Sequence, residues 1–201
     1  WLKWTREIQA LAQTGETYAE NGWQSERYAR LMAIAAEITA AHSDMDEKRL
    51  LETFQSERGY ATPKVDVRAA AFRDGDLLMV REISDGRWTL PGGWADVGDI
   101  PSEAAERETW EESGYQVKAT KLIGLYDANR SQPMAFFHAY KIIFLCEIVD
   151  GDAKISSETS EVAFFSESEI PKDLSLARTP KRVIKDCFTA YADQSIDTKF
   201  D

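Results

Sequence analysis

One stretch of the chain reads Leu90-Pro-Gly-Gly-Trp-Ala-Asp-Val-Gly-Asp-Ile-Pro-Ser-Glu-Ala-Ala-Glu-Arg-Glu-Thr-Trp-Glu-Glu-Ser-Gly-Tyr115, and the other elements are arranged around it. Pro91-Gly92-Gly93 predicts a loop or turn. Asp99 suits the cap of a helix whose first turn holds Pro101. Gly114 suits the left-handed residue that ends such a helix. The stretch therefore predicts a glycine loop, a helix and a glycine stop.

Three glutamates lie on one face of this predicted helix. Glu108, Glu111 and Glu112 are spaced i, i+3 and i+4, so their carboxylates are neighbours. Like charges at this spacing weaken a helix by about 0.2–0.5 kcal/mol per pair. A hard divalent cation removes that repulsion, because carboxylate oxygens are its preferred ligands, and Mg²⁺ in such sites usually also binds substrate phosphates. The spacing therefore predicts a metal site that serves a phosphorylated substrate.

The alternative explanation is a solvated acidic helix face, which is how most runs of like charge end. Three observations favour the metal site. The three glutamates lie one helix length from the rigid Pro91-Gly92-Gly93 segment, Arg107 is close enough to orient them, and strand-like sequence bounds the helix on both sides.

The stretch resembles the signature of the Nudix hydrolases. That signature has a Gly, five residues, a Glu, seven residues and then Arg-Glu-apolar-x-Glu-Glu-x-Gly-apolar. Here it begins at Gly93 and ends with Arg107-Glu-Thr-Trp-Glu-Glu-Ser-Gly-Tyr115. Asp99 stands where the family usually has Glu, and Thr109 stands at a usually apolar position. A match over so many spaced positions is a specific signal, unlike a lone short glycine motif.

The resemblance implies a fold, a reaction and a set of ligands. The fold is an α/β/α sandwich around a mixed β-sheet, over roughly residues 63–195. The reaction is hydrolysis of a phosphoanhydride with Mg²⁺ or Mn²⁺ as cofactor. The implied metal ligands are the side chains of Glu108, Glu111 and Glu112 and the main-chain carbonyl of Gly92. Glycine lets the backbone approach the ion without a Cβ. Arg107 is expected to support the glutamates, and Arg107 and Glu112 are expected catalytic residues.

The residue pattern outside the signature predicts the same fold class. Strands are expected at Val65–Phe72 and Leu77–Glu82, with a tight turn at Asp74-Gly75 between them. Further elements are strands at Val117–Leu125, Phe136–Val149 and Glu161–Phe165, a polar loop at Tyr126–Pro133, and a terminal helix at Thr179–Ala192. Strands interrupted by two helices indicate an α/β/α sandwich with a mixed sheet.

Residues 1–60 have helical periodicity and are predicted to form a separate small module, with a boundary at Gly59–Pro63 and a second domain over residues 63–201. Its third helix is expected at Met45–Glu57, capped by Ser43 or Asp44. So small a module has a thin core and often gains stability from a neighbour or a second copy. Trp1, Trp4 and Trp23 either make that contact or close the local core.

The helical leader resembles one found on a subset of the Nudix hydrolases. The segments Gly59-Tyr-Ala-Thr-Pro-Lys-Val-Asp-Val-Arg68 and Leu90-Pro-Gly-Gly-Trp-Ala-Asp-Val-Gly98 are also similar to that subset. Its members cleave nucleoside diphosphates linked to another group and include CDP-choline and ADP-ribose pyrophosphatases. Their leader is a dimerisation element. The resemblance therefore implies a homodimer and a small nucleotide substrate.

Composition narrows the possible partners. The 201 residues have a formal net charge of −11, which disfavours general nucleic-acid binding. The two cysteines, Cys146 and Cys187, have no metal-binding spacing and are typical of buried thiols in a reducing compartment. No signal-peptide pattern and no bilayer-spanning apolar run is visible, so we expect a cytoplasmic protein without a membrane partner.

The reaction also needs a general base and cations for the phosphates. Glu161 is the preferred base, with Glu158 or one of the signature glutamates as alternatives. Arg68 and Arg81 are candidate phosphate contacts. An exposed ion pair with Asp66, on the same strand face, explains Arg68 equally well.

Aromatic side chains are candidate partners for a nucleobase, although large aromatics are more often core residues. The candidates are Trp88, Trp94, Tyr126 and Phe137. His138 lies beside an aromatic run, and a core or loop position explains it better than catalysis.

Three functions are compatible with these patterns. The first is a Mg²⁺-dependent pyrophosphatase of nucleoside diphosphate derivatives. The second is a hydrolase of RNA ends or nucleoside triphosphates. The third is a nucleotide sensor that keeps the fold without catalysis, and the complete glutamate triplet argues against it.

Overall fold

The computed structural model describes residues 1–131 and 138–201. The chain divides into two compact units, Trp1–Pro63 and Lys64–Asp201. In the part of the chain that the structure describes, no helix is long and apolar enough to span a bilayer.

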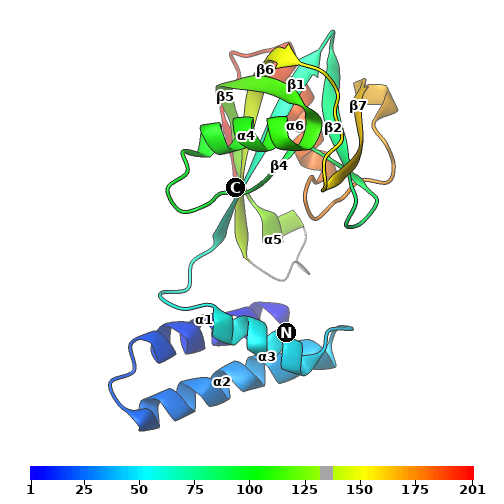
Figure 1. Cartoon of the computed structure of the whole chain (residues 1–201). Helices are drawn as coiled ribbons and strands as arrows, with labels where there is room; N and C mark the ends of the chain where they lie inside the picture. The colour runs from blue at the N-terminus through cyan, green and yellow to red at the C-terminus, as the bar shows by residue number, and fades with distance from the viewer. Residues whose placement is uncertain (132–137) are drawn as a thin grey trace. The chain divides into compact units, whose positions relative to one another are not determined.

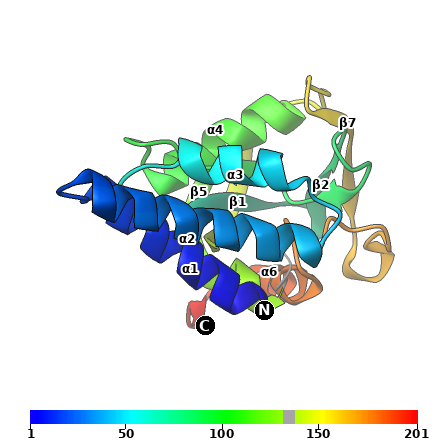
Figure 2. The ribbon, with the colours of Figure 1, turned by 90° about the horizontal axis from the view of Figure 1, so that it is seen from below.

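The first unit consists of three helices, as the periodicity predicted: α1 (Leu2–Thr17), α2 (Gly22–Ala41) and α3 (Glu47–Ser56). Figure 2 shows α2 between α1 and α3. Asn21 caps α2 by accepting a hydrogen bond from the Gln24 amide at 3.0 Å. The predicted cap of the third helix was wrong, because Asp46 rather than Ser43 or Asp44 accepts the Arg49 amide, at 2.9 Å. The core of this unit contains few large side chains. Its buried apolar residues are Ala12, Met32, Ala35, Ala36, Leu50 and Phe54.

All three tryptophans of this unit lie outside its buried core. Trp1 stacks on His42 with ring centroids 4.8 Å apart. Trp4 is 70% exposed and Trp23 is 61% exposed, with the Arg27 guanidinium 3.4 Å from the Trp23 ring centroid. Closure of the local core therefore does not explain Trp4 or Trp23.

The second unit contains a mixed sheet with the order β3-β2-β1-β6-β5-β8, to which β4 adds by pairing with β1 and β7 by pairing with β2. Strands β1 and β6 are parallel, whereas β5 and β6 are antiparallel. The strands are β1 (Lys64–Arg73), β2 (Asp76–Glu82), β3 (Trp88–Thr89), β4 (Gly92–Trp94), β5 (Tyr115–Asp127), β6 (Ala139–Gly151), β7 (Thr159–Phe165) and β8 (Lys199–Phe200). The helical elements are α4 (Pro101–Ser113), α5 (Ala128–Ser131), the 3₁₀ turn η1 (Glu167–Glu169) and α6 (Lys181–Ala192).

Helices α4 and α6 cover opposite faces of this sheet (Figure 1). Alternate residues of β1 explain the arrangement, because successive side chains of a strand point to opposite faces. Val67, Ala69 and Ala71 pack with Ala104 and Ala105 of α4. Ala70 and Phe72 pack in a second cluster that contains Val183, Cys187 and Phe188 of α6. The predicted α/β/α sandwich is confirmed.

The turn between the first two strands is confirmed at Asp74-Gly75, where both residues have positive φ angles of 54° and 93°. Two predicted loops were wrong. Gly92 and Gly93 pair with Arg68 and Val67 as part of β4, and the start of the Tyr126–Pro133 segment continues β5 to Asp127. Phe136, Phe137 and Pro133 lie outside the described residues. The remaining predicted strands and the terminal helix are present within a few residues of their expected bounds.

Gly92 has φ +136°, and a Cβ on it would lie 2.1 Å from the Val67 carbonyl oxygen. No side chain fits there, because both the backbone angle and the close approach of β1 exclude it.

We predict that Gly92→Ala lowers the free energy of unfolding by about 3 kcal/mol or more, the sum of backbone strain and a clash with backbone. Gly75→Ala is the matched control, since Gly75 has φ +93° with open space around it. It should lose only about 1–2 kcal/mol. Urea unfolding of both variants measures the difference, and equal losses would contradict the close approach.

Candidate functional site

Helix α4 carries the three glutamates and begins one residue later than the sequence suggested. Ile100 is the N-cap residue and makes no side-chain cap, while Pro101 opens the helix. Asp99 was expected to be the cap, and this was wrong. Its carboxylate instead accepts the Asp96 amide at 3.0 Å and Arg107 Nη2 at 3.2 Å. The helix ends at Gly114 in the left-handed conformation, as predicted.

Glu112 joins α4 to the diglycine strand. Its buried carboxylate accepts the Gly92 amide at 2.9 Å, and its main-chain carbonyl accepts the Thr159 hydroxyl at 2.6 Å. Burial raises the pKa of Glu112 to about 7, although the nearby Arg68 charge and the Gly92 amide favour the ionised form. A buried carboxylate with a raised pKa has a strong need for a further positive partner.

Glu108 lies against the second glycine. A Cβ on Gly93 would be 3.0 Å from Glu108 Oε2, so glycine leaves room for this carboxylate beside β4. Partial burial raises the pKa of Glu108, and the Arg107 charge opposes that rise. Glu111 is about half exposed and lies on the same side of the helix.

Arg107 connects the acidic groups of the signature. Its guanidinium lies 2.7 Å from Glu108, 3.3 Å from Glu111 and 3.2 Å from Asp99. Asp99 is shorter than the Glu usual at this position, yet it still pairs with Arg107. Arg107 therefore offsets the like charges that the spacing of the glutamates brings together.

The site offers oxygen donors alone, which is the chemistry of a hard cation. Gly93 leaves space beside Glu108, and the Gly92 amide holds Glu112 next to it, so the residues present fit a divalent ion. Among residues 1–131 and 138–201, however, no three His, Cys, Asp or Glu side chains already form a ligand cluster. Because Arg107 bridges two of the three carboxylates, joint capture of an ion by Glu108, Glu111 and Glu112 stays a prediction.

The structure places Arg68 in the protein interior. Its side chain is 4% exposed, and Nε and Nη2 donate to Asp66 at 3.1 and 2.9 Å, while Nη1 donates to the Leu90 carbonyl at 3.0 Å. Lys141 Nζ lies 3.1 Å from Asp66 on the other side. The exposed ion pair considered from the sequence is therefore wrong, since the pair is buried.

Arg81 and Glu161 pair with each other across β2 and β7. Arg81 Nη1 lies 2.6 Å from Glu161, and Nη2 lies 3.7 Å from Asp173, with both pairs well exposed. Glu158 is exposed and directly precedes β7, and its carbonyl accepts a hydrogen bond from the Ile83 amide at 2.8 Å. The structure does not bring Arg81 or Glu161 into contact with the signature glutamates.

The aromatic candidates occupy different environments. Trp88 and Tyr126 are buried, and the Tyr126 hydroxyl donates to Asp186 at 3.0 Å. Trp94 is half exposed. Phe137 lies outside the described residues. His138 Nε2 lies 3.3 Å from Asp127 in a partly exposed loop position.

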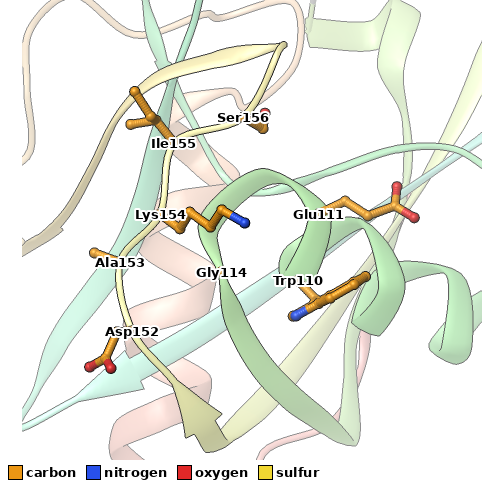
Figure 3. Close-up of a pocket in the computed structure, with 8 residues that line it drawn as sticks. All are labelled: Trp110, Glu111, Gly114, Asp152, Ala153, Lys154, Ile155 and Ser156. Atoms are coloured by element: carbon orange, nitrogen blue, oxygen red, sulfur yellow. The ribbon is translucent and has the colours of Figure 1, made fainter.

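A hollow of about 550 Å³ lies at the C-terminal end of α4, between Trp110 and the segment from Asp152 to Ser156. Figure 3 shows the Lys154 side chain directed toward α4, whereas the Glu111 carboxylate points away from this segment. The hollow borders only one of the three glutamates, so it is not organised around the acidic site.

Several buried polar residues of the second unit were not identified from the sequence. Asp66 was noted only as a surface partner, while Lys141, Glu82 and Thr159 were not considered. Glu82 is buried at the end of β2, where it pairs with Thr159 of β7. A lysine in an otherwise apolar strand was the available signal for Lys141, but its partner depends on the register of β1 and β6.

Comparison with known proteins agrees with this geometry. Residues 62–187 match the model of the NUDIX domain, and residues 1–54 match a model described as "UDP-X-like, N-terminal oligomerisation domain". Over 184 residues the chain is 38% identical to the Bacillus subtilis protein named "Putative ADP-ribose pyrophosphatase YjhB", covering 91% of this chain and 88% of that protein.

Two crystal structures have similar folds. One is an ADP-ribose pyrophosphatase from Streptococcus suis, with a TM-score of 0.64 and 34% identity over 70% of this chain and 100% of that one. The other is a UDP-X diphosphatase, with a TM-score of 0.64 and 30% identity over 99% of this chain and 96% of that one. The glutamate helix, the diglycine strand and these matches lead to one conclusion: the chain belongs to the Nudix hydrolase family.

Proposed function

We propose that this chain is a divalent-metal-dependent pyrophosphatase of nucleoside diphosphates linked to a second group. Hydrolysis of the anhydride gives a nucleoside monophosphate and a phosphorylated partner. ADP-ribose, UDP-linked compounds and CDP-choline are the preferred substrates, since similar proteins are named for the first two and the sequence resembles pyrophosphatases of the first and third.

The observation that carries the proposal is the contact between the Glu112 carboxylate and the Gly92 amide. The contact places a carboxylate with a raised pKa beside Gly92, a position where the backbone angle and the nearby β1 exclude any side chain. A solvated acidic helix face would have no reason to bury Glu112 in this way.

In this proposal Glu108, Glu111 and Glu112, with the Gly92 carbonyl, would hold Mg²⁺ or Mn²⁺. When bound, the ion offsets phosphate charge and lowers the pKa of a water molecule. Glu112 supplies a carboxylate already fixed by a backbone amide, and Glu108 lies against Gly93. Arg107 orients Glu108 through their ion pair, and it forms a second ion pair with Asp99.

We retain Glu161 as a candidate base and Arg81 as a candidate phosphate contact. Either role requires their 2.6 Å ion pair to open. Glu158 and the signature glutamates are the alternatives for the base. RNA ends and nucleoside triphosphates are the alternative substrates, and the net charge of −11 disfavours RNA as a polyanionic partner.

We also propose that the first unit mediates homodimerisation. Trp4 and Leu11 are 70% and 61% exposed and lie seven residues apart on one face of α1. The family model that matches this unit is described as an oligomerisation domain. A second copy of the chain is therefore the occupant we assign to this face.

Metal removal and loss of Glu112 should abolish turnover. In Mg²⁺, the chain should hydrolyse ADP-ribose, a UDP-sugar or CDP-choline, and EDTA should stop the reaction. Glu112→Gln should lower kcat/KM by at least about 100-fold, since it removes a direct ligand. Glu103→Gln, at an exposed position of the same helix, is the control and should keep its activity. Full turnover by Glu112→Gln would reject the assignment, and product analysis identifies the bond that breaks.

The raised pKa of Glu112 predicts how stability depends on pH in the metal-free protein. The folded carboxyl titrates at about 7 and the unfolded one near 4.5, so the folded state binds more protons between these values. Stability from this group is therefore present below pH 4.5 and is lost as pH rises to 7. The loss is on the order of 3 kcal/mol, at about 1.36 kcal/mol per pKa unit. In EDTA, wild type should lose more stability than Glu112→Gln between pH 5 and pH 8, and parallel losses would contradict the burial argument.

Disruption of the α1 face should convert the dimer to a monomer. Trp4→Ser combined with Leu11→Glu places polar groups on that face, and light scattering after size exclusion should give the monomer mass. Val149→Glu, at a 61% exposed apolar position of the second unit, is the control and should remain dimeric. A dimeric double variant, or a monomeric wild type, would contradict the proposal.

A further inference from the structure

A buried ion cluster lies beside the diglycine strand. Asp66 and Arg68 of β1 and Lys141 of β6 each have side chains 4% exposed. Asp66 accepts two hydrogen bonds from Arg68 and lies 3.1 Å from Lys141 Nζ. The two cations keep the pKa of Asp66 below its usual value against the opposing effect of burial. So many buried charges are costly unless each has a fixed partner, so the cluster should hold a single geometry.

Arg68 also reaches the segment that leads into the site. Its Nη1 donates to the Leu90 carbonyl at 3.0 Å, and the next residue of β1, Ala69, donates its amide to the Pro91 carbonyl at 3.0 Å. In the β1–β4 pairing Arg68 is opposite Gly92, whose amide donates to Glu112. A continuous set of contacts therefore runs from Asp66 through Arg68 and β4 to the acidic helix.

We propose that Arg68 is a positioning residue: its guanidinium, fixed by Asp66, holds the Leu90 carbonyl and so presents the Gly92 backbone to Glu112 and to the metal. Its catalytic consequence rests on the proposed function. A planar guanidinium can bond Asp66 with one edge and Leu90 with the other, which an ammonium cannot do at the same length. This role replaces phosphate contact, because Arg68 is buried and its three donor nitrogens all have partners within the protein.

Arg68→Lys tests the geometry while it keeps the positive charge. In the metal-free protein, the Gly92 amide should exchange with solvent at least about 10-fold faster, relative to amides of the β5–β6 ladder, because its local opening becomes easier. Mn²⁺ alone should bind about 10- to 100-fold more weakly by calorimetry, as expected when the support of a ligand is lost. In turnover, kcat should fall while KM for the nucleotide stays within about twofold.

Lys141→Met is the matched control. Lys141 is equally buried and pairs with the same carboxylate, but no contact joins it to Leu90. This variant should lose stability, yet its normalised Gly92 exchange and its Mn²⁺ affinity should stay within about twofold of wild type. Arg68→Gln, which keeps some hydrogen bonding in a smaller side chain, provides a second variant if Arg68→Lys does not fold.

Three results would overturn the proposal. Unchanged Gly92 exchange and Mn²⁺ affinity in Arg68→Lys would remove the positioning role. A raised KM with unchanged kcat would assign Arg68 to phosphate binding instead. If Lys141→Met changed Gly92 exchange and Mn²⁺ affinity as much as Arg68→Lys does, the ion cluster would contribute only to the stability of the fold. Absence of hydrolysis by wild type would reject the proposed function separately, because the exchange measurement needs neither metal nor substrate.

Discussion

The hydrogen bond from the Gly92 amide to the Glu112 carboxylate is the contact on which the site depends. It joins a strand and a helix that come from one continuous stretch of sequence. The strand must be glycine because β1 lies too close for a Cβ, and the helix must end at Gly114 because the chain turns back there into β5. The same stretch of sequence therefore provides both the glycines that the backbone requires and the position of the Glu112 carboxylate.

Charge balance is the second constraint. The acidic groups of α4 repel one another, and Arg107 offsets that repulsion from within the same helix. On the other side of β4, Arg68 and Lys141 neutralise Asp66 in the protein interior. An unpaired charge in the protein interior is costly, so the ion pairs of Asp66 with Arg68 and Lys141 should hold a fixed geometry. Glu112 has a hydrogen bond from a neutral amide and the more distant charge of Arg68, and it is the group with a pKa raised to about 7.

The fold could be predicted from local patterns, because strand and helix periods, the Asp74-Gly75 turn and the glycine stop at Gly114 are written in neighbouring residues. The same patterns misled at Gly92-Gly93, where glycine usually indicates a loop but here allows a strand to approach β1. The prediction for Asp99 failed for a similar reason. Asp99 is suited to capping a helix, but its carboxylate pairs with Arg107 instead. The buried cluster of Asp66, Arg68 and Lys141 could not be predicted from the sequence. Asp66 and Lys141 are 75 residues apart in the chain, and only the register of β1 and β6 brings them together.

Anomalous diffraction from crystals soaked in Mn²⁺ tests the proposed metal site most directly. We predict an anomalous peak within bonding distance of the Glu112 carboxylate and the Gly92 carbonyl, with Glu108 turned from Arg107 toward the ion. A peak elsewhere in the molecule, or no peak with Glu108 and Glu111 still bridged by Arg107, would contradict it.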